Sequence, residues 1–223
     1  MRHRSRAVVS LLALVLAACG GDASEDSTPE VIGPGADTPV AAVEAMIDAI
    51  NTADFAAAGQ MSVPGQAALA SLAEGATFGD VADALEEADG QVAVNLWSGF
   101  AQGAGSLLTG DVSISEDSVI TQDEVDFHQV VVTTADGESR IVLVREVDGH
   151  RVDLFASFGK AWADKMIAPV ERLLTTQTDE ARLILTELQQ IVPSLLATAS
   201  LPGTTGAESQ QLLALVEVIT RVR

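Results

Sequence analysis

The sequence predicts an α+β fold in which helices come before and after an antiparallel sheet. Apolar residues recur at helical spacing from residue 38 to about residue 108. From about residue 111 to residue 156 they alternate with polar residues, as in strands that bury one face. Helical spacing returns after Gly159 and continues almost to the end of the chain. Helices are therefore expected to cover one face of a curved antiparallel sheet.

The helices before the sheet are placed by their start and stop residues. Thr38 fits an N-cap and Pro39 fits the first helical position, so the first helix is expected from Pro39 to Asn51. Further helices are expected over 55–61 after Asp54, 65–75 after Pro64, and 81–89 with Asp80 as its cap. A longer helix is expected over 91–108, because its apolar residues form one stripe.

The sheet is expected to be a meander of strands joined by tight turns. A first strand is predicted at 112–114, a turn at 115–117, and a continuation at 119–120. Three further strands are predicted over 125–134, 140–147 and 150–155. Asp-Gly pairs at 136–137 and 148–149 separate these strands, and Asp-Gly between alternating runs is the strongest short-range hairpin signal.

Three helices are expected after the sheet. The first runs over 162–174 and is bent or broken at Pro169, and the second runs over 184–195 with Pro193 near its end. Thr205 and Glu208 form a T-x-x-E capping box that begins the last helix, which is expected to end at about residue 222.

The N-terminus carries the strongest functional signal. Three arginines precede an apolar run of about ten residues, which is too short to cross a membrane core that needs about 20. The run ends in Leu16, Ala17, Ala18 and Cys19. This segment resembles the lipobox of bacterial lipoprotein signal peptides. The resemblance implies removal of a signal peptide at 1–18 and acylation of Cys19.

An acylated Cys19 implies an exported protein, lipid-anchored on the outer side of the bacterial cytoplasmic membrane or in the outer membrane. Cys19 is the only cysteine, so a disulfide within one chain is impossible. Residues 19–37 are rich in Gly, Ser, Pro and acidic residues, which predicts an acidic flexible tether before the folded part.

Charge is distributed unevenly along the chain, whose formal net charge is −20. Residues 19–139 hold 22 acidic and no basic side chains, whereas residues 140–223 hold 10 acidic and 9 basic ones. Such a surface repels nucleic acid, so no nucleic-acid partner is expected. The acidic residues either recruit cations or a basic partner, or serve solubility and adaptation to a salty medium.

Two stretches are typical of one superfamily. TPVAAVEAMIDAINTADFAAAGQM at 38–61 combines a helix start, an Asn-x-x-Asp break and a short helix, and SRIVLVREVDGHRVDLF at 139–155 combines two strands and an Asp-Gly turn. They resemble the NTF2-like (cystatin-like cone) superfamily, particularly small bacterial lipoproteins with that domain. The resemblance covers 38–158, although 62–108 holds more helix than a minimal domain. Residues 159–223, a helical C-terminal extension, either pack onto the open face of the sheet or form a separate unit.

The resemblance implies a cone-shaped pocket, which enzymes of the superfamily line with an Asp or His base and Tyr or Asp donors. This chain has no tyrosine, and its histidines after Cys19 are His128 and His150. His128 with Asp153 on a nearby strand is one candidate base, and Asp48 is another. An ordinary strand histidine and a solvated acid are the competing interpretations. No P-loop, G-x-S-x-G or H-E-x-x-H motif occurs, and neither a cofactor nor a metal site is expected.

These observations favour a membrane-anchored cell-envelope lipoprotein that acts as a non-catalytic binding or interaction module. One alternative is a carrier that holds a lipid or another apolar ligand between the sheet and the C-terminal helices. A second alternative is an NTF2-like isomerase or dehydratase, which requires a buried acid or histidine in a pocket. The expected partners are the membrane, through acylated Cys19, and either a protein or an apolar ligand.

Overall fold

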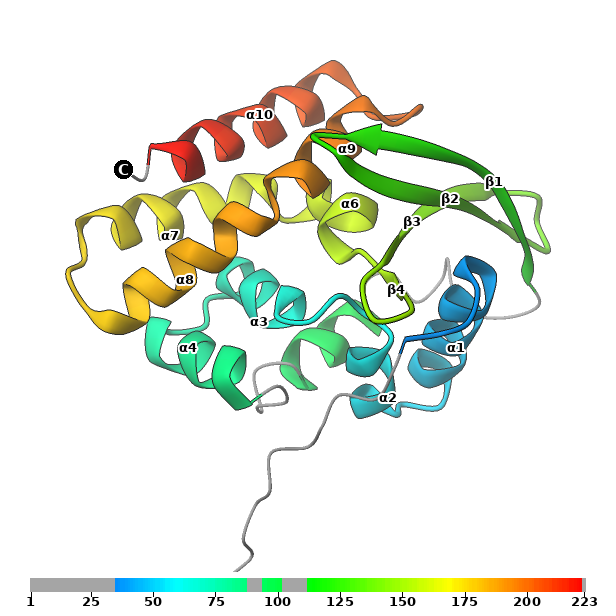
Figure 1. Ribbon diagram of the computed structural model, residues 1–223, viewed down its shortest axis with the longest axis horizontal. Coiled ribbons are helices and arrows are strands. Elements are labelled where there is room, and N and C mark those ends of the chain that lie inside the picture. Colours follow the sequence, from blue (N-terminus) through cyan, green and yellow to red (C-terminus); the bar gives the residue numbers. More distant parts are fainter. Residues whose placement is uncertain (1–34, 88–93, 102–111, 222–223) are drawn as a thin grey trace, which may run out of the picture.

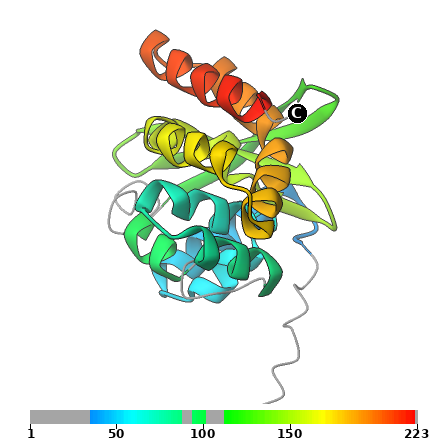
Figure 2. The same cartoon turned by 90° about the vertical axis from the view of Figure 1, so that its left-hand side faces the viewer.

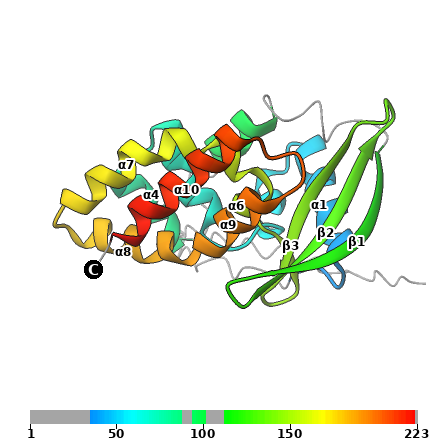
Figure 3. The same cartoon turned by 90° about the horizontal axis from the view of Figure 1, so that it is seen from above.

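The computed structural model describes residues 35–87, 94–101 and 112–221. It shows an α+β structure in which helices pack beside one curled antiparallel sheet, as the sequence predicts (Figure 1). The sheet lies at one end of the molecule and most of the helices lie at the other (Figure 3). The helices that follow the sheet lie above those that precede it (Figure 2).

The helices before the sheet largely match the predicted segments. They are α1 (Pro39–Asn51), α2 (Phe55–Gln60), α3 (Gln66–Ala70), the 3-10 helix η1 (Ser71–Glu74) and α4 (Phe78–Glu87). Thr38 and Asp54 cap α1 and α2 through their side chains, as expected. Residues 94–101 are helical, and the rest of the helix predicted over 91–108 lies outside the described residues.

The predicted cap of α4 is wrong. Thr77 is the capping residue, because its Oγ1 accepts a hydrogen bond from the Asp80 N–H at 3.2 Å. Asp80 lies in the first turn and accepts a bond from the Thr77 N–H at 3.3 Å. The two residues form a reciprocal capping box in which the acidic residue is at the third helical position.

The sheet has four strands in the order β1-β2-β3-β4, each antiparallel to the next, as predicted for a meander. They are β1 (Val112–Gln122), β2 (Val125–Thr134), β3 (Ser139–Glu146) and β4 (His150–Val152). The predicted turn at 115–117 is wrong, because β1 continues through it with a register shift between Glu116 and Val119. Such a bulge inserts residues without ending the strand. Asp123 and Glu124 form the turn into β2, with φ values of 47° and 65°.

The segment after β4 turns into helices earlier than predicted. The helices are α6 (Leu154–Phe158), η2 (Gly159–Ala161), α7 (Ala163–Thr175), α8 (Asp179–Gln190), α9 (Val192–Ser200) and α10 (Gly206–Thr220). The strand predicted over 150–155 ends at Val152, because Asp153 caps α6. Pro169 lies inside a continuous α7, and Pro193 lies in the first turn of α9, where a missing N–H costs no helical bond. The capping box that begins α10 is confirmed.

The two faces of the sheet are covered by different helices. Val130 and Val142 belong to the main hydrophobic cluster, which includes the buried face of α1. Phe127 and Leu143 form a second cluster with residues of α6 and α9. The main cluster extends from Ala42 in α1 to Ile219 in α10, so residues 159–221 share a core with the part before them.

The folded part begins before the predicted start at residue 38. Ala36 forms an antiparallel bridge with His150, and the Gly35 N–H donates to the Asp148 carbonyl at 3.1 Å. The last residues of the predicted tether, 19–37, are therefore paired with β4. Sequence composition alone did not indicate this pairing, because the bonds are made by the backbone.

Candidate functional site

One edge of the sheet, formed by β4 and the adjoining part of β3, is bonded to other segments of the chain. At His150 it pairs with Ala36, and at Val152 it pairs with Ser62, just after α2. The Val152 N–H donates to the Met61 carbonyl at 2.8 Å. The edge of β4 is thus closed at both positions.

The same edge continues along β3, where α6 takes over from β4. The Leu143 N–H donates to Ser157 Oγ at 2.8 Å, and the Leu143 carbonyl accepts from the Asp153 N–H at 2.8 Å. Backbone groups point to alternate edges along a strand, so the N–H and C=O of Ile141 point to this edge as well. Within the described part of the chain, nothing is bonded to the Ile141 backbone there. The edge is open at this position.

A groove lies beside the open edge, between β3 and the loop that joins α9 to α10. It has two halves with volumes of about 730 Å³ and 500 Å³. Both halves are lined by Arg140, Ser157, Phe158 and Lys160, so we treat them as one groove. Each half falls within the range of roughly 300–1,000 Å³ that is usual for small-molecule sites.

The second half of the groove has an aromatic wall formed by Phe100, Phe158 and Trp162. The Phe100 ring centroid lies 4.9 Å from that of Phe158 and 6.4 Å from that of Trp162. Trp97 packs against Phe100, and Phe155 packs against Trp162. The chain has only six Phe, two Trp and no Tyr, so this cluster holds half of its Phe residues and both Trp residues.

Three cations border the groove in a chain of net charge −20. Lys165 Nζ lies 3.1 Å from the Glu74 carboxylate, and Lys160 Nζ lies 3.6 Å from the Glu208 carboxylate. The Glu208 carboxylate also accepts the N-cap backbone bond of α10, which lowers its pKa. Arg140 is exposed and forms no ion pair with the described residues. Glu74 and Glu208 line the groove as well, so its lining holds three cations and two anions, and the excess positive charge is that of Arg140.

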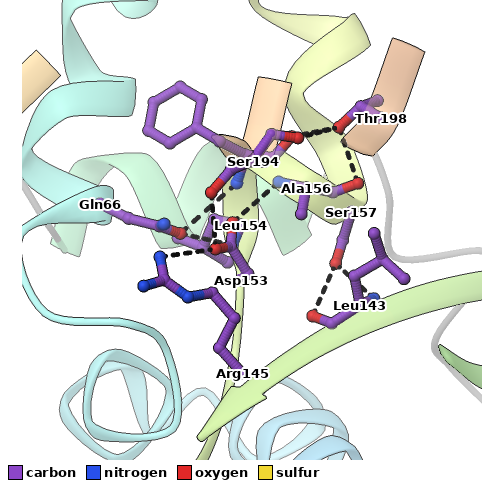
Figure 4. A network of polar contacts seen from close by, with 10 residues as sticks. Gln66, Leu143, Arg145, Asp153, Leu154, Ala156, Ser157, Ser194 and Thr198 are labelled. Carbon is purple, nitrogen blue, oxygen red and sulfur yellow. Dashed lines mark hydrogen bonds and ion pairs between the residues drawn. The ribbon is translucent and has the colours of Figure 1, made fainter. Parts of the chain in front are cut away.

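Asp153, a predicted catalytic partner, is fully buried and holds the start of α6 (Figure 4). Its carboxylate accepts from the Ala156 N–H at 2.8 Å and from the Ser194 hydroxyl at 2.7 Å. The Arg145 guanidinium lies 3.4 Å away. These bonds tie β3, α6 and α9 together, so the side chain has a structural role in the arrangement observed.

The His128 side chain is not in contact with Asp153. Its Nδ1 lies 3.0 Å from Glu116 Oε1, and its ring packs edge-to-face on His150 with centroids 5.2 Å apart. Successive side chains of a strand point to opposite faces, and Phe127 faces α6 and α9. His128 and the α6 cap are therefore on opposite faces of the sheet, and the proposed His-Asp pair is not formed.

Asp48 is exposed on α1. The predicted lipidation site Cys19 and the lipobox residues Leu16, Ala17 and Ala18 lie outside the described residues.

Across 35–87, 94–101 and 112–221, no three His, Cys, Asp or Glu side chains are grouped so that they could hold a metal ion. In the same ranges, no helix has the length and apolar character needed to cross a membrane.

Sequence reasoning missed a buried arginine. Arg151 is 0% exposed and donates to the two Asp148 carboxylate oxygens at 2.6 Å and 2.9 Å, and also to the Gln60 carbonyl. The bond from Arg151 holds the pKa of Asp148 below its ordinary value. This contact joins the turn between β3 and β4 to the end of α2, and no local pattern predicts it.

The sequence did not predict the groove either, although the position of the first basic residue after the signal segment was an indication of it. Arg140 is the first basic residue after Arg6, and it lines both halves of the groove. Comparison of the chain with family models, with curated proteins and with solved structures finds no match. The groove is therefore the feature from which a function can be inferred.

Proposed function

We propose that this protein is a membrane-anchored envelope lipoprotein whose folded part binds an apolar ligand in the groove without chemical change. The observation that carries the proposal is the groove between the sheet and the C-terminal helices, with its aromatic wall. Aromatic side chains offer large rigid surfaces that suit apolar ligands. Of the binding functions that the sequence favours, a carrier fits this geometry best.

We also propose a distant NTF2-like relationship for residues 38–158. The packing of α1 against a curled antiparallel meander supports it. The helices after β4 are a difference from a minimal domain, since they form one side of the groove. The enzyme alternative has weaker support, because neither His128 nor Asp153 lines the groove.

The carrier proposal is tested by native mass spectrometry of the protein purified from its membrane. We expect a bound apolar molecule in the wild type and its loss in Ala161→Trp, since the exposed Ala161 lines the aromatic half of the groove. Ala56→Trp on α2 is the control, because Ala56 is exposed and lies outside the groove. Equal occupancy in both variants would contradict the proposal.

The anchor is tested separately. Cys19→Ser removes the thiol that acylation needs, so the protein should move from the membrane fraction to the soluble fraction. One acyl chain gives only marginal binding and two or more hold firmly, so loss of all chains should release it. Unchanged membrane retention of Cys19→Ser would rule out the lipobox interpretation.

A further inference from the structure

We propose that the ligand of the groove is a long-chain carboxylate whose head group binds between Arg140 and Lys160. This inference rests on the proposed function and specifies the chemical class of the ligand. It places the charged head at the middle of the groove and the apolar chain along the aromatic wall.

The position of the two cations supports a head group at the middle. Arg140 and Lys160 are the charged residues among the four that line both halves of the groove. Phe158 lies with them, and Phe100 and Trp162 continue the apolar surface into the second half. A positive centre next to an aromatic wall matches a molecule with one anionic end and one apolar body.

The two cations are available to a ligand. Arg140 forms no ion pair within the described ranges. The Lys160–Glu208 distance of 3.6 Å exceeds the roughly 2.7–2.9 Å of a strong charge-assisted bond. Glu208 is held instead by Thr205, whose N–H and hydroxyl donate at 2.7 Å and 2.8 Å. Lys160 can therefore bind a carboxylate without breaking that capping box.

The open edge of β3 adds a backbone donor. The Ile141 N–H points to the same edge as Leu143, and Ile141 lines the first half of the groove next to Arg140. A buried or half-buried N–H gains free energy from an acceptor that covers it. A carboxylate has two oxygens, so it can accept from this N–H and from a cation at once.

Charge complementarity distinguishes this ligand from an uncharged one. With a net charge of −20, most of the surface repels an anion, so the local cations determine where the head group binds. An uncharged ligand with the same chain gains the aromatic contacts and loses the charge-assisted bonds. Affinity should therefore differ between the two, and the difference should depend on Arg140 and Lys160.

The experiment uses residues 19–223 with Cys19→Ser, which contain every described residue. Dodecanoate and 1-dodecanol share one chain length and differ in the head group. Their binding at pH 7.5 is followed by tryptophan fluorescence, because Trp162 lines the groove and Trp97 belongs to the same aromatic cluster. We expect dodecanoate to bind about tenfold or more tightly than the alcohol, the size expected for hydrogen bonds to a charged group.

The matched variants are Arg140→Gln with Lys160→Gln, and Arg172→Gln as the control. Arg172 is exposed on α7 and does not line the groove. The double variant should lose the preference for dodecanoate and still bind dodecanol, whereas Arg172→Gln should behave as the wild type. Equal binding of both ligands by wild type and double variant overturns the carboxylate inference and leaves the carrier proposal standing. Failure of both ligands to bind overturns both proposals.

Discussion

The edge of the sheet formed by β4 and β3 differs along its length. Between residues 143 and 152 it is bonded to the segment before α1, to the segment after α2, and to α6. At Ile141 it is open and faces the groove. Unpaired edges invite association with other chains, and proteins commonly cover them or place charges on them. Here the closed part is covered and the open part is bordered by Arg140 and Lys160.

The two parts also differ in the kind of residue on which they depend. The closed part relies on fully buried polar groups, including Asp153, Ser194 and Arg151. The open part is bordered by exposed cations and aromatic side chains. Substitutions in the closed part should therefore reduce stability, and substitutions in the open part should reduce binding.

The largest loss of stability is expected for Asp153→Ala. The change removes the cap of α6 and leaves the Arg145 guanidinium and the Ser194 hydroxyl without their buried acceptor. We expect a loss of about 3 kcal/mol in the free energy of unfolding, measured by urea denaturation. Asp48→Ala on the exposed face of α1 is the control and should change it by about 0.5 kcal/mol or less. Similar losses in both variants would contradict the role given to the cap.

Gly149→Ala is expected to lower the free energy of unfolding by roughly 2 kcal/mol. Gly149 has a φ of 121°, and an added Cβ would lie 2.7 Å from the Gly35 backbone. The substitution should strain the turn and displace Ala36 from the edge of β4. Gly137→Ala is the matched control, because Gly137 also has a positive φ, of 83°, and its added Cβ meets nothing within 4 Å. Gly137→Ala should lower the free energy of unfolding by only about 1 kcal/mol, the cost of a positive φ for a residue with a Cβ.

Hydrogen exchange separates the two glycine variants. The Ala36 N–H, bonded to the His150 carbonyl at 2.9 Å, should lose protection in Gly149→Ala and keep it in Gly137→Ala. Unchanged protection in both variants would show that Gly149 can move without disturbing this edge.

Ser157→Ala should remove the Leu143 N–H bond and leave the Leu143 carbonyl bonded to the Asp153 N–H. It leaves the buried Leu143 N–H without its acceptor at 2.8 Å, which costs about 1–2 kcal/mol. Ser200→Ala is the control, because Ser200 is exposed and its hydroxyl bonds only within α9. A comparison of urea midpoints checks the difference, and no difference between the variants would argue that the Ser157 bond is replaced by solvent.

Local signals explain which parts of the fold were predictable. The bounds of α1 and β2 follow from Thr38, Pro39 and the alternation in 125–134, and these predictions were confirmed. Local signals also caused two errors. At 115–117, polar residues predicted a turn, whereas they form a bulge in β1. Asp153 was assigned to a strand, whereas it is the N-cap of α6 with an extended backbone. At 115–117 the pairing of β1 with β2 decides the conformation, and at Asp153 the bonds to Ser194 and to the Leu143 carbonyl contribute.

The candidate site was less predictable because its residues come from distant parts of the chain. The groove joins Phe100, Arg140, Lys160 and Leu201, and no short motif contains two of them. Arg151 donates to a carbonyl 91 residues away. Such contacts depend on tertiary packing, which a single sequence does not specify position by position. The lipidation of Cys19, by contrast, depends on adjacent residues and stays a prediction of the sequence alone.

The smallest effect on stability is expected for Arg140→Gln, and the comparison with Arg145→Gln makes it informative. Both arginines lie on β3, but Arg145 is paired with the buried Asp153 and lies over the Phe127 ring, whereas Arg140 is exposed at the groove. We expect Arg145→Gln to lower the free energy of unfolding by about 1–2 kcal/mol. Arg140→Gln should keep it within about 0.5 kcal/mol of the wild-type value. Urea denaturation at two salt concentrations measures both. A loss in Arg140→Gln as large as that in Arg145→Gln would mean that the open edge also depends on its charge for folding, and the separation between a stabilising part and a binding part would fail.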